Sequence, residues 1–501
     1  MNDPVLLGRR EITAHVENPE STVDFVTESN VLDILQRALP VHAKNRAEID
    51  YLYHYYKGKQ DILRREKVIR PEICNRVVEN RANEIVSFKS GYLMGEPVQY
   101  VARNGDQEDT AENILRLNEY VFAEEKASKD KELSDWFHIC GLGYRLVLPD
   151  DTGEEDEAPF ETNVLDPRNT FVVKRDTPDR EPLLGVTYVI TDTGVIRYSA
   201  YSRTRYFEIT SNTGPEMSSA LGFSIVRSES HVLGAVPIIE YPLNLSRQGA
   251  FEIVLPLLNT MNLLESNRMD DVEQVVQALM LFKNVDISTE DYETLRERGA
   301  LKVRDIDTNT KADVSYLINT LNQTQTQVIM DHLYQTMLTI CGMPNRNGGS
   351  STSDTGSAVI MRDGWSAAEA RAKDAELMFK KAEKQFLNIV LTICRTFGRF
   401  DLRLSQVDIQ FTRRNYENIT EKANVLVSML SNNKIHPRLA FVHCGMFTDP
   451  DLAYSLSAEY AAEREAQSLE RAKLYAGETQ DTEETEAPNE VETENSGSEA
   501  S

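Results

Sequence analysis

Three copies of the triplet Asp-Thr-Gly are the residues in this chain that most resemble a catalytic motif. They are Asp151–Gly153, Asp192–Gly194 and Asp354–Gly356. Aspartic proteases bring two such carboxylates together so that they share one proton. Here the first triplet lies in an acid-rich loop, and the second joins VTYVI to VIRYSA as a hairpin turn. The third precedes a helix whose free amides Asp, Thr or Ser can cap. None has the strand context of a protease site, and we expect no protease activity.

Nucleotide hydrolysis is excluded on similar grounds. The segment Gly342–Gly349 is rich in glycine, but it lacks the lysine of the phosphate-binding pattern GxxxxGK[ST] and the hydrophobic strand before it. The chain is therefore not a motor ATPase.

The cysteines and histidines predict no metal site. The five cysteines are odd in number and form no CxxC pair, which indicates small core residues in a reducing compartment. His436, His443 and Cys444 are the nearest approach to a ligand set, but no second cluster at zinc-like spacing accompanies them. No Ser-His-Asp set stands out among the eight histidines. We expect no catalytic residue, no metal and no cofactor.

The charge balance limits the kind of DNA contact that the protein can make. Lys and Arg number 54 against 80 Asp and Glu, a net charge of −26. Nine acids lie in the last 25 residues, which we expect to be a disordered tail, and the remainder still carries about −17 by the same count. Such a chain cannot hold DNA over its whole surface by neutralising phosphates. It also has no signal peptide and no apolar run long enough to span a membrane, so we expect a soluble protein.

The sequence of the first half of the chain predicts helices followed by a sheet. Residues 33–144 are mainly helical in pattern, including a helix that starts near Pro71 and ends at Gly91–Pro97, where a strand begins, and helices near 109–127 and 128–140. From Tyr144 to Tyr241 the runs are short and β-rich, and turn residues separate them, which predicts antiparallel sheet: YRLVL, NTFVVK, GVTYVITD, VIRYSAYS, RTRYFEIT, FSIVR and AVPIIEYP.

The second half begins with two long helices that flank a small island. The first starts at Ala250, and the second covers about 322–341, where one face is shared by Val328, Ile329, His332, Leu333, Thr336, Met337 and Ile340. Between them lie the strands QALMLFKNVD and ALKVRDID around a helix in STEDYETLRERG, and then a further strand, ADVSYLI.

The loop GMPNRNGGSSTSDTGS is the most unusual segment, because connections longer than about 12–15 residues are uncommon between packed elements. One helix follows it, from Ser357 to about Gly398. Its predicted core stripe is Trp365, Ala368, Ala372, Ala375, Phe379, Ala382, Phe386, Ile389, Ile393 and Phe397, with the ion pairs Glu369–Lys373 and Glu376–Lys380 on other faces. A strand, VDIQFTRR, and a helical region 418–476 with breaks at SNNK and TDP complete the chain.

This order of elements resembles the portal proteins of long-tailed bacteriophages, which are ring-shaped head–tail connectors. The residues that carry the resemblance are GYLMGEPV, VPIIEYPLN, VVQALMLFKNVD, GGSSTSDTGSAVIMRDG and the ending FTRRNYENITEKANVLVSML…FTDPDLAYSLSAEY, over roughly residues 45–465. The resemblance implies an α+β fold with the portal regions called wing, stem, clip and crown.

Carried over residue by residue, the resemblance implies seven regions. They are a wing (41–248), stem helix 1 (249–276), a clip (277–318), stem helix 2 (319–341), a tunnel loop (342–357), the wing's long helix and return strand (358–414) and a crown (415–476). The N-terminal extension (1–40) and the acidic tail (477–501) fall outside the resemblance, which implies nothing for them.

The resemblance also implies the site residues and partners. The DNA-facing tunnel loop would use Asn345, Arg346, Asn347, Gly348, Gly349, Ser350, Ser351, Thr352 and Ser353, and the clip would dock partners through Glu290, Asp291, Glu293 and Arg296. We expect a ring of twelve copies in the virion, assembled in the host cytoplasm, with double-stranded DNA in its channel. Its partners would be the terminase motor, a head-completion adaptor, the major capsid protein and the scaffold protein, with no membrane. The alternative is a minor capsid or scaffold-like structural protein without a DNA channel.

Overall fold

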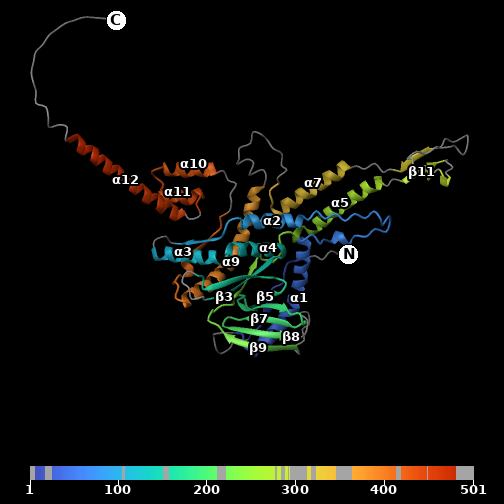
Figure 1. The fold of residues 1–501 in the computed structure, drawn as a ribbon, viewed down its shortest axis with the longest axis horizontal. Coiled ribbons are helices and arrows are strands. Elements are labelled where there is room, and N and C mark those ends of the chain that lie inside the picture. The colour runs from blue at the N-terminus through green and yellow to red at the C-terminus, as the bar shows by residue number, and fades with distance from the viewer. Residues whose placement is uncertain are drawn as a thin grey trace, which may run out of the picture. The chain divides into compact units, whose positions relative to one another are not determined.

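A computed structural model describes residues 6–16, 25–103, 108–150, 157–211, 222–276, 279–283, 288–290, 293, 313–317, 323–345, 364–412, 419–447 and 450–480. The chain divides into two compact units, Met1–Tyr416 and Glu417–Ser501. Helices and mainly antiparallel sheets build the described part of the first unit, and helices build that of the second (Figure 1). The predicted α+β class is therefore confirmed.

The helices agree with the sequence pattern except at their ends, and the largest difference is at α2, which begins at Arg81 and not near Pro71. The α-helices are α1 (Val31–Tyr56), α2 (Arg81–Leu93), α3 (Glu108–Ala123), α4 (Lys126–Cys140), α5 (Leu255–Val276), α7 (Gln323–Cys341), α9 (Trp365–Thr396), α10 (Ile419–Leu430), α11 (Pro437–Cys444) and α12 (Pro450–Gln480). Short 3₁₀ turns cover Asp61–Arg64, Glu252–Val254 and Leu404–Gln406.

The strands of the described residues form four sheets. Their bounds are β1 (Ile12–Ala14), β2 (Gln99–Ala102), β3 (Leu142–Pro149), β4 (Phe160–Leu165), β5 (Thr170–Arg175), β6 (Pro182–Ile190), β7 (Ile196–Tyr201), β8 (Arg205–Ser211), β9 (Phe223–Ser230), β10 (Ile238–Pro242), β11 (Leu279–Lys283), β12 (Asp313–Leu317) and β13 (Val407–Gln410). The orders are β1-β5-β6-β7-β8-β9, β10-β3-β4, β11-β12 and β13-β2. All seven runs predicted between residues 144 and 241 are strands, whereas β1 and β4 were not predicted.

Buried and exposed residues alternate along the strands of the six-stranded sheet, so one face of the sheet is buried. Tyr198 and Ala200 on β7 are fully buried and stand opposite Ile209 and Phe207 on β8, which are also fully buried. The buried face packs against the first part of α1, which lies against this sheet in Figure 1. The pairs are antiparallel except for β1, which runs parallel to β5.

The turn between β6 and β7 contains the second Asp-Thr-Gly triplet. Gly194 has φ +79°, and the amide of Thr191 donates to the carbonyl of Val195 at 2.9 Å. This triplet therefore serves a hairpin, as predicted. The other two triplets lie outside the described residues, apart from their flanks.

Helix α9 contributes most of its buried residues to an apolar cluster that is separate from the one between α1 and the six-stranded sheet. Eight residues of its predicted stripe are buried: Ala368, Ala372, Ala375, Phe379, Ala382, Phe386, Ile389 and Ile393. The two exceptions are Trp365, which is only half-buried at the first position of the helix, and Phe397, which follows the end of the helix and is 39% exposed. The described helix begins at Trp365, so the predicted start at Ser357 lies outside the described residues.

Four buried charges lie where α9 crosses α4 and β3. Lys126 Nζ is 2.7 Å from Asp130 Oδ2 and 2.7 Å from Glu383 Oε1, while Arg145 pairs with Asp130 and lies 3.6 Å from Glu383. None of these four side chains is more than 4% exposed. The group is electrically neutral, which is the condition under which buried charges are tolerated.

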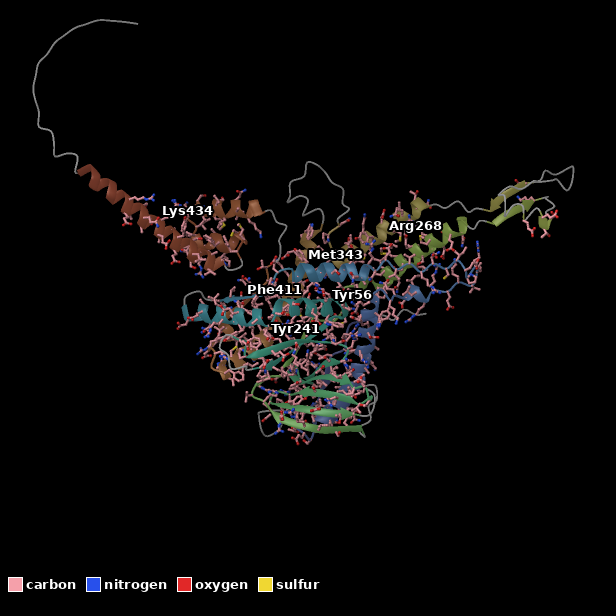
Figure 2. All side chains as sticks on the ribbon, viewed as in Figure 1. Tyr56, Tyr241, Arg268, Met343, Phe411 and Lys434 are labelled. Atoms are coloured by element: carbon pink, nitrogen blue, oxygen red, sulfur yellow. The ribbon has the colours of Figure 1, made fainter. Side chains whose placement is uncertain are left out.

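Two tyrosines complete the hydrogen bonding of this charge cluster. Tyr100 from β2 and Tyr241 from β10 donate to the two oxygens of Glu383, at 2.5 and 2.8 Å (Tyr241 is labelled in Figure 2). Burial by itself would raise the pKa of Glu383. The charges of Lys126 and Arg145 more than offset this effect, and the pKa lies below its ordinary value.

The second unit is built from α10, α11 and α12, with the break at SNNK where it was predicted. His436 caps α11 by accepting from the amide of Arg438 at 3.2 Å, and Cys444 is buried. No cluster of three or more His, Cys, Asp or Glu that could hold a metal occurs among the residues the structure describes. In that same part of the chain, no helix has the length and apolar character needed to cross a bilayer.

We predict that Glu383→Gln lowers the free energy of unfolding by about 3–5 kcal/mol at pH 7, because it leaves Lys126 and Arg145 buried against one carboxylate. The folded-state pKa of Glu383 is lowered, so its stabilisation is present above about pH 4.3 and is lost as the pH falls below that value. The difference between wild type and variant should therefore shrink in acid. Urea unfolding followed by tryptophan fluorescence measures both effects.

The matched control is Glu376→Gln on the same helix. Glu376 forms an i,i+4 pair with Lys380 at 2.7 Å near the surface, and its loss should cost less than about 1 kcal/mol. Equal losses for the two variants would contradict the role assigned to the buried cluster.

Candidate functional site

Helices α5 and α7 form a pair that lies side by side in the first unit (Figure 1). At one end they share a core, in which Val254 and Leu258 meet Met337 and Leu338. Further along, Arg268 on α5 donates to Gln327 on α7 at 2.9 Å (Arg268 is labelled in Figure 2). We call α5 and α7 the stem pair.

Most of the face predicted for α7 lies outside the core of the single chain. The residues of α7 that are buried are Met330, Met337, Leu338 and Cys341, whereas Val328, Ile329 and Ile340 are 63%, 50% and 40% exposed. Only Met337 belongs to both sets. Because α7 is apolar on more than one face, its sequence does not say which face meets α5.

The stem pair consequently leaves apolar side chains uncovered in the single chain. Those that are at least 38% exposed are Leu263, Met269 and Val272 on α5 and Val328, Ile329 and Ile340 on α7. An apolar surface of this kind on two adjacent helices is typical of a protein interface.

A second face of α5 is covered by residues 74–80, a segment that we call the strap. The amides of Glu79, Val77 and Asn75 donate to the side chains of Asn262 (3.0 Å), Ser266 (2.9 Å) and Asp270 (2.6 Å). All three acceptors are at most 2% exposed.

The strap fits α5 because four residues of the helix and two residues of the strap cover nearly the same distance. Four residues of α-helix advance about 6 Å, and two residues of extended chain advance about 6.6 Å. Side chains at positions i, i+4 and i+8 of α5 can therefore meet every second amide of the strap.

This contact overturns the prediction that one helix runs from about Pro71 to Gly91. Residues 74–80 are neither helix nor strand, Asn80 has a left-handed backbone with φ +39°, and α2 begins only at Arg81. The spacing of Ile73, Val77 and Val78 imitates a helix, but the strap obtains its hydrogen bonds from α5 instead.

The C-terminal end of α7 is fixed by a Schellman motif. Gly342 has φ +64°, its amide donates to Thr339, and the amide of Met343 donates to Leu338 at 2.8 Å. Met343 is 6% exposed and belongs to the same core as the stem pair (Figure 2). The chain therefore leaves the helix from a rigid anchor.

The start of α9 lies beside this anchor. Gly364, with φ +83°, has the carbonyl oxygen of Met343 and the Cα of Pro344 within 4 Å of its Cβ position. The amides of Ala367 and Ala368 donate to the Gly364 carbonyl. The two ends of segment 346–363 are thus held next to each other.

Of the predicted tunnel-loop residues, the structure places only Asn345, which is half-buried directly after Pro344. Arg346, Asn347, Gly348, Gly349, Ser350, Ser351, Thr352 and Ser353 lie outside the described residues. Their contact with DNA stays a prediction, and so does the capping role of Asp354–Ser357.

The predicted clip is described in part. β11 and β12 pair antiparallel, with Phe282 opposite Val314. Glu290 and Glu293 are exposed and helical in conformation, while Asp291 and Arg296 lie outside the described residues. Nothing in the described part tests whether these residues dock a partner.

Comparison with known proteins gives one family match. The family model "Phage portal protein, SPP1 Gp6-like" matches residues 35–481. No curated protein matches the chain. Among solved structures, a chain from the "Neck of empty GTA particle computed with C6 symmetry" matches with a TM-score of 0.40 and 10% sequence identity, over 73% of this chain and 90% of that one.

We predict that Asp270→Ala releases the strap, because Asp270 accepts from Asn75 and also pairs with Arg65 and Lys67 at 2.9 and 3.0 Å. Hydrogen exchange at the strap amides should become roughly tenfold faster or more, the effect of losing a buried charge-assisted bond. Asp271→Ala, which removes the exposed neighbouring carboxylate, is the matched control. Unchanged hydrogen exchange in Asp270→Ala would contradict the role of Asp270 in holding the strap. Equal acceleration in the two variants would contradict it as well.

Proposed function

Because the chain belongs to the SPP1 Gp6-like family of phage portal proteins, we propose that it forms a ring of twelve copies at one vertex of a viral capsid. Members of this family are structural proteins of the phage particle. The ring would be the channel through which double-stranded DNA is packaged and later ejected. The observation that carries this proposal is the family match over residues 35–481.

The uncovered apolar side chains of the stem pair support ring formation. In a closed ring, one surface of each subunit meets a different surface of its neighbour. The exposed residues of α5 and α7, such as Met269 and Val328, give the chain an apolar surface that a second copy can bury.

The charge of the chain supports a channel in which DNA slides. Many Lys and Arg contacts would release counterions and hold the DNA tightly. With a net charge of −26, this chain is suited to weak, repulsive contact instead.

We propose a different partner for each region of the chain. Segment 345–353 would face the DNA, and the clip around Glu290 and Glu293 would dock the terminase during packaging and the head-completion adaptor afterwards. The outer parts of the ring would contact the major capsid and scaffold proteins. Assembly would take place in the host cytoplasm, and the protein would act as a conduit rather than as an enzyme.

Electron microscopy of the purified full-length protein tests the proposal. We predict closed rings with a central hole. Monomers, filaments or closed shells would instead favour a minor capsid or scaffold-like protein without a channel.

We also predict that removing Gly348–Ser353 leaves ring assembly intact and reduces DNA packaging or retention, because the anchors at Met343 and Gly364 remain. Microscopy measures the rings, and quantification of encapsidated DNA measures packaging. A variant with the same six residues in scrambled order keeps the length and composition and should package normally. Normal packaging by the shortened chain would overturn the role of this segment.

A further inference from the structure

A cavity of about 340 Å³ lies where α2, α7 and α9 meet the segment 243–250. This volume falls in the range of small-molecule sites in proteins. The walls are mainly apolar and include Phe88, Leu93, Leu243, Ile253, Ala372 and Ala375.

Two cations line this cavity. Lys89 on α2 and Arg371 on α9 have no ion pair or hydrogen bond to any other residue that the structure describes. Burial lowers the pKa of Lys89, and the positive charge of Arg371 lowers it further. Lys89 is half-buried, and its charge costs free energy in the empty protein, because it loses part of its hydration and has no counter-charge among the described residues.

The position of Arg371 is constrained by the end of α7. A Cβ on Gly342 would come within 2.8 Å of Arg371 Cγ, so the arginine stem packs directly on the glycine of the Schellman motif. The stem of Arg371 is therefore held beside the cavity, while the residue as a whole is exposed to solvent.

The other titratable groups of the cavity do not neutralise these charges. Burial lowers the pKa of His138 to about 3, so this ring is neutral. Burial raises the pKa of Cys341 to about 11, so its thiol is uncharged at neutral pH. Asp374 is an acid among the lining residues, but it is exposed and makes no ion pair within the described chain.

We propose that this cavity binds an organic monoanion, with a carboxylate-type headgroup held between Lys89 and Arg371 and an apolar body against the aliphatic and aromatic walls. Two cations that line the same cavity select the negative charge. The apolar lining disfavours a fully hydrated inorganic anion, because that ion would lose its water without replacement. This binding site is additional to the proposed function in DNA passage and does not depend on it.

The probe is 8-anilinonaphthalene-1-sulfonate, a fluorescent monoanion with an aromatic body, titrated into the purified full-length protein. Lys89→Met and Arg371→Met should each weaken its binding at this site about tenfold or more, as expected on losing a charge-assisted hydrogen bond. Lys373→Met is the matched control. Lys373 is exposed on the same helix and pairs with Glu369 at 3.7 Å, so its loss should leave binding unchanged.

Two further measurements separate ligand binding from a structural role. Lys89→Met should raise the thermal midpoint by roughly 2–4 °C, because it removes an uncompensated charge, whereas loss of a structural lysine would lower it. Octanoate should displace the probe, and inorganic phosphate at equal ionic strength should not.

Equal binding by wild type and Lys89→Met would overturn the proposal. So would equal loss in Lys373→Met, which would indicate non-specific attraction, or full displacement by phosphate, which would indicate a simple oxyanion site. Because these experiments use the purified protein and no DNA, their failure would be independent of any failure in packaging.

Discussion

The neutral cluster of Lys126, Asp130, Arg145 and Glu383 is the interaction on which the arrangement of the first unit depends. It joins α4, β3 and α9, and the tyrosines that donate to Glu383 add β2 and β10. Each of these elements also has apolar contacts, but apolar contacts tolerate sliding by a residue more readily than paired charges do. The cluster therefore sets the position of α9 along its axis. Through α9, it also sets where Arg371 and Gly364 lie relative to the end of α7.

Much of this fold follows from periodicity in the sequence. The stripe from Ala368 to Ile393 repeats at helical steps, and the alternation in VIRYSAYS repeats at two, so both elements and their buried faces could be predicted. The resemblance to portal proteins rested on the order of such elements, and the family match agrees with it. These features are local, or depend only on the order of local features.

What could not be predicted depends on partners far away in the sequence. Nothing near Asn75 or Val77 indicates that their amides are satisfied by Asp270 and Ser266, nearly two hundred residues later. The spacing Asn262, Ser266 and Asp270 was visible as a polar stripe, but an exposed face of a helix has the same spacing. Glu383 likewise stands in the run KKAEKQ, which has the composition of a solvent-facing surface. Glu383 differs from a surface glutamate in being buried and paired, and the residues next to it in the sequence indicate neither property.

The adjacent ends of segment 346–363 have an evolutionary consequence. A chain whose two anchors already touch can be lengthened at small cost, since each doubling of a flexible loop costs only about 0.6 kcal/mol in closure entropy. Insertions or deletions between Met343 and Gly364 would leave the Schellman motif, the stem pair and α9 unchanged. The length of this segment is therefore a trait that selection can adjust without redesigning the scaffold. Related chains can be expected to differ more in its length than in the helices on either side of it.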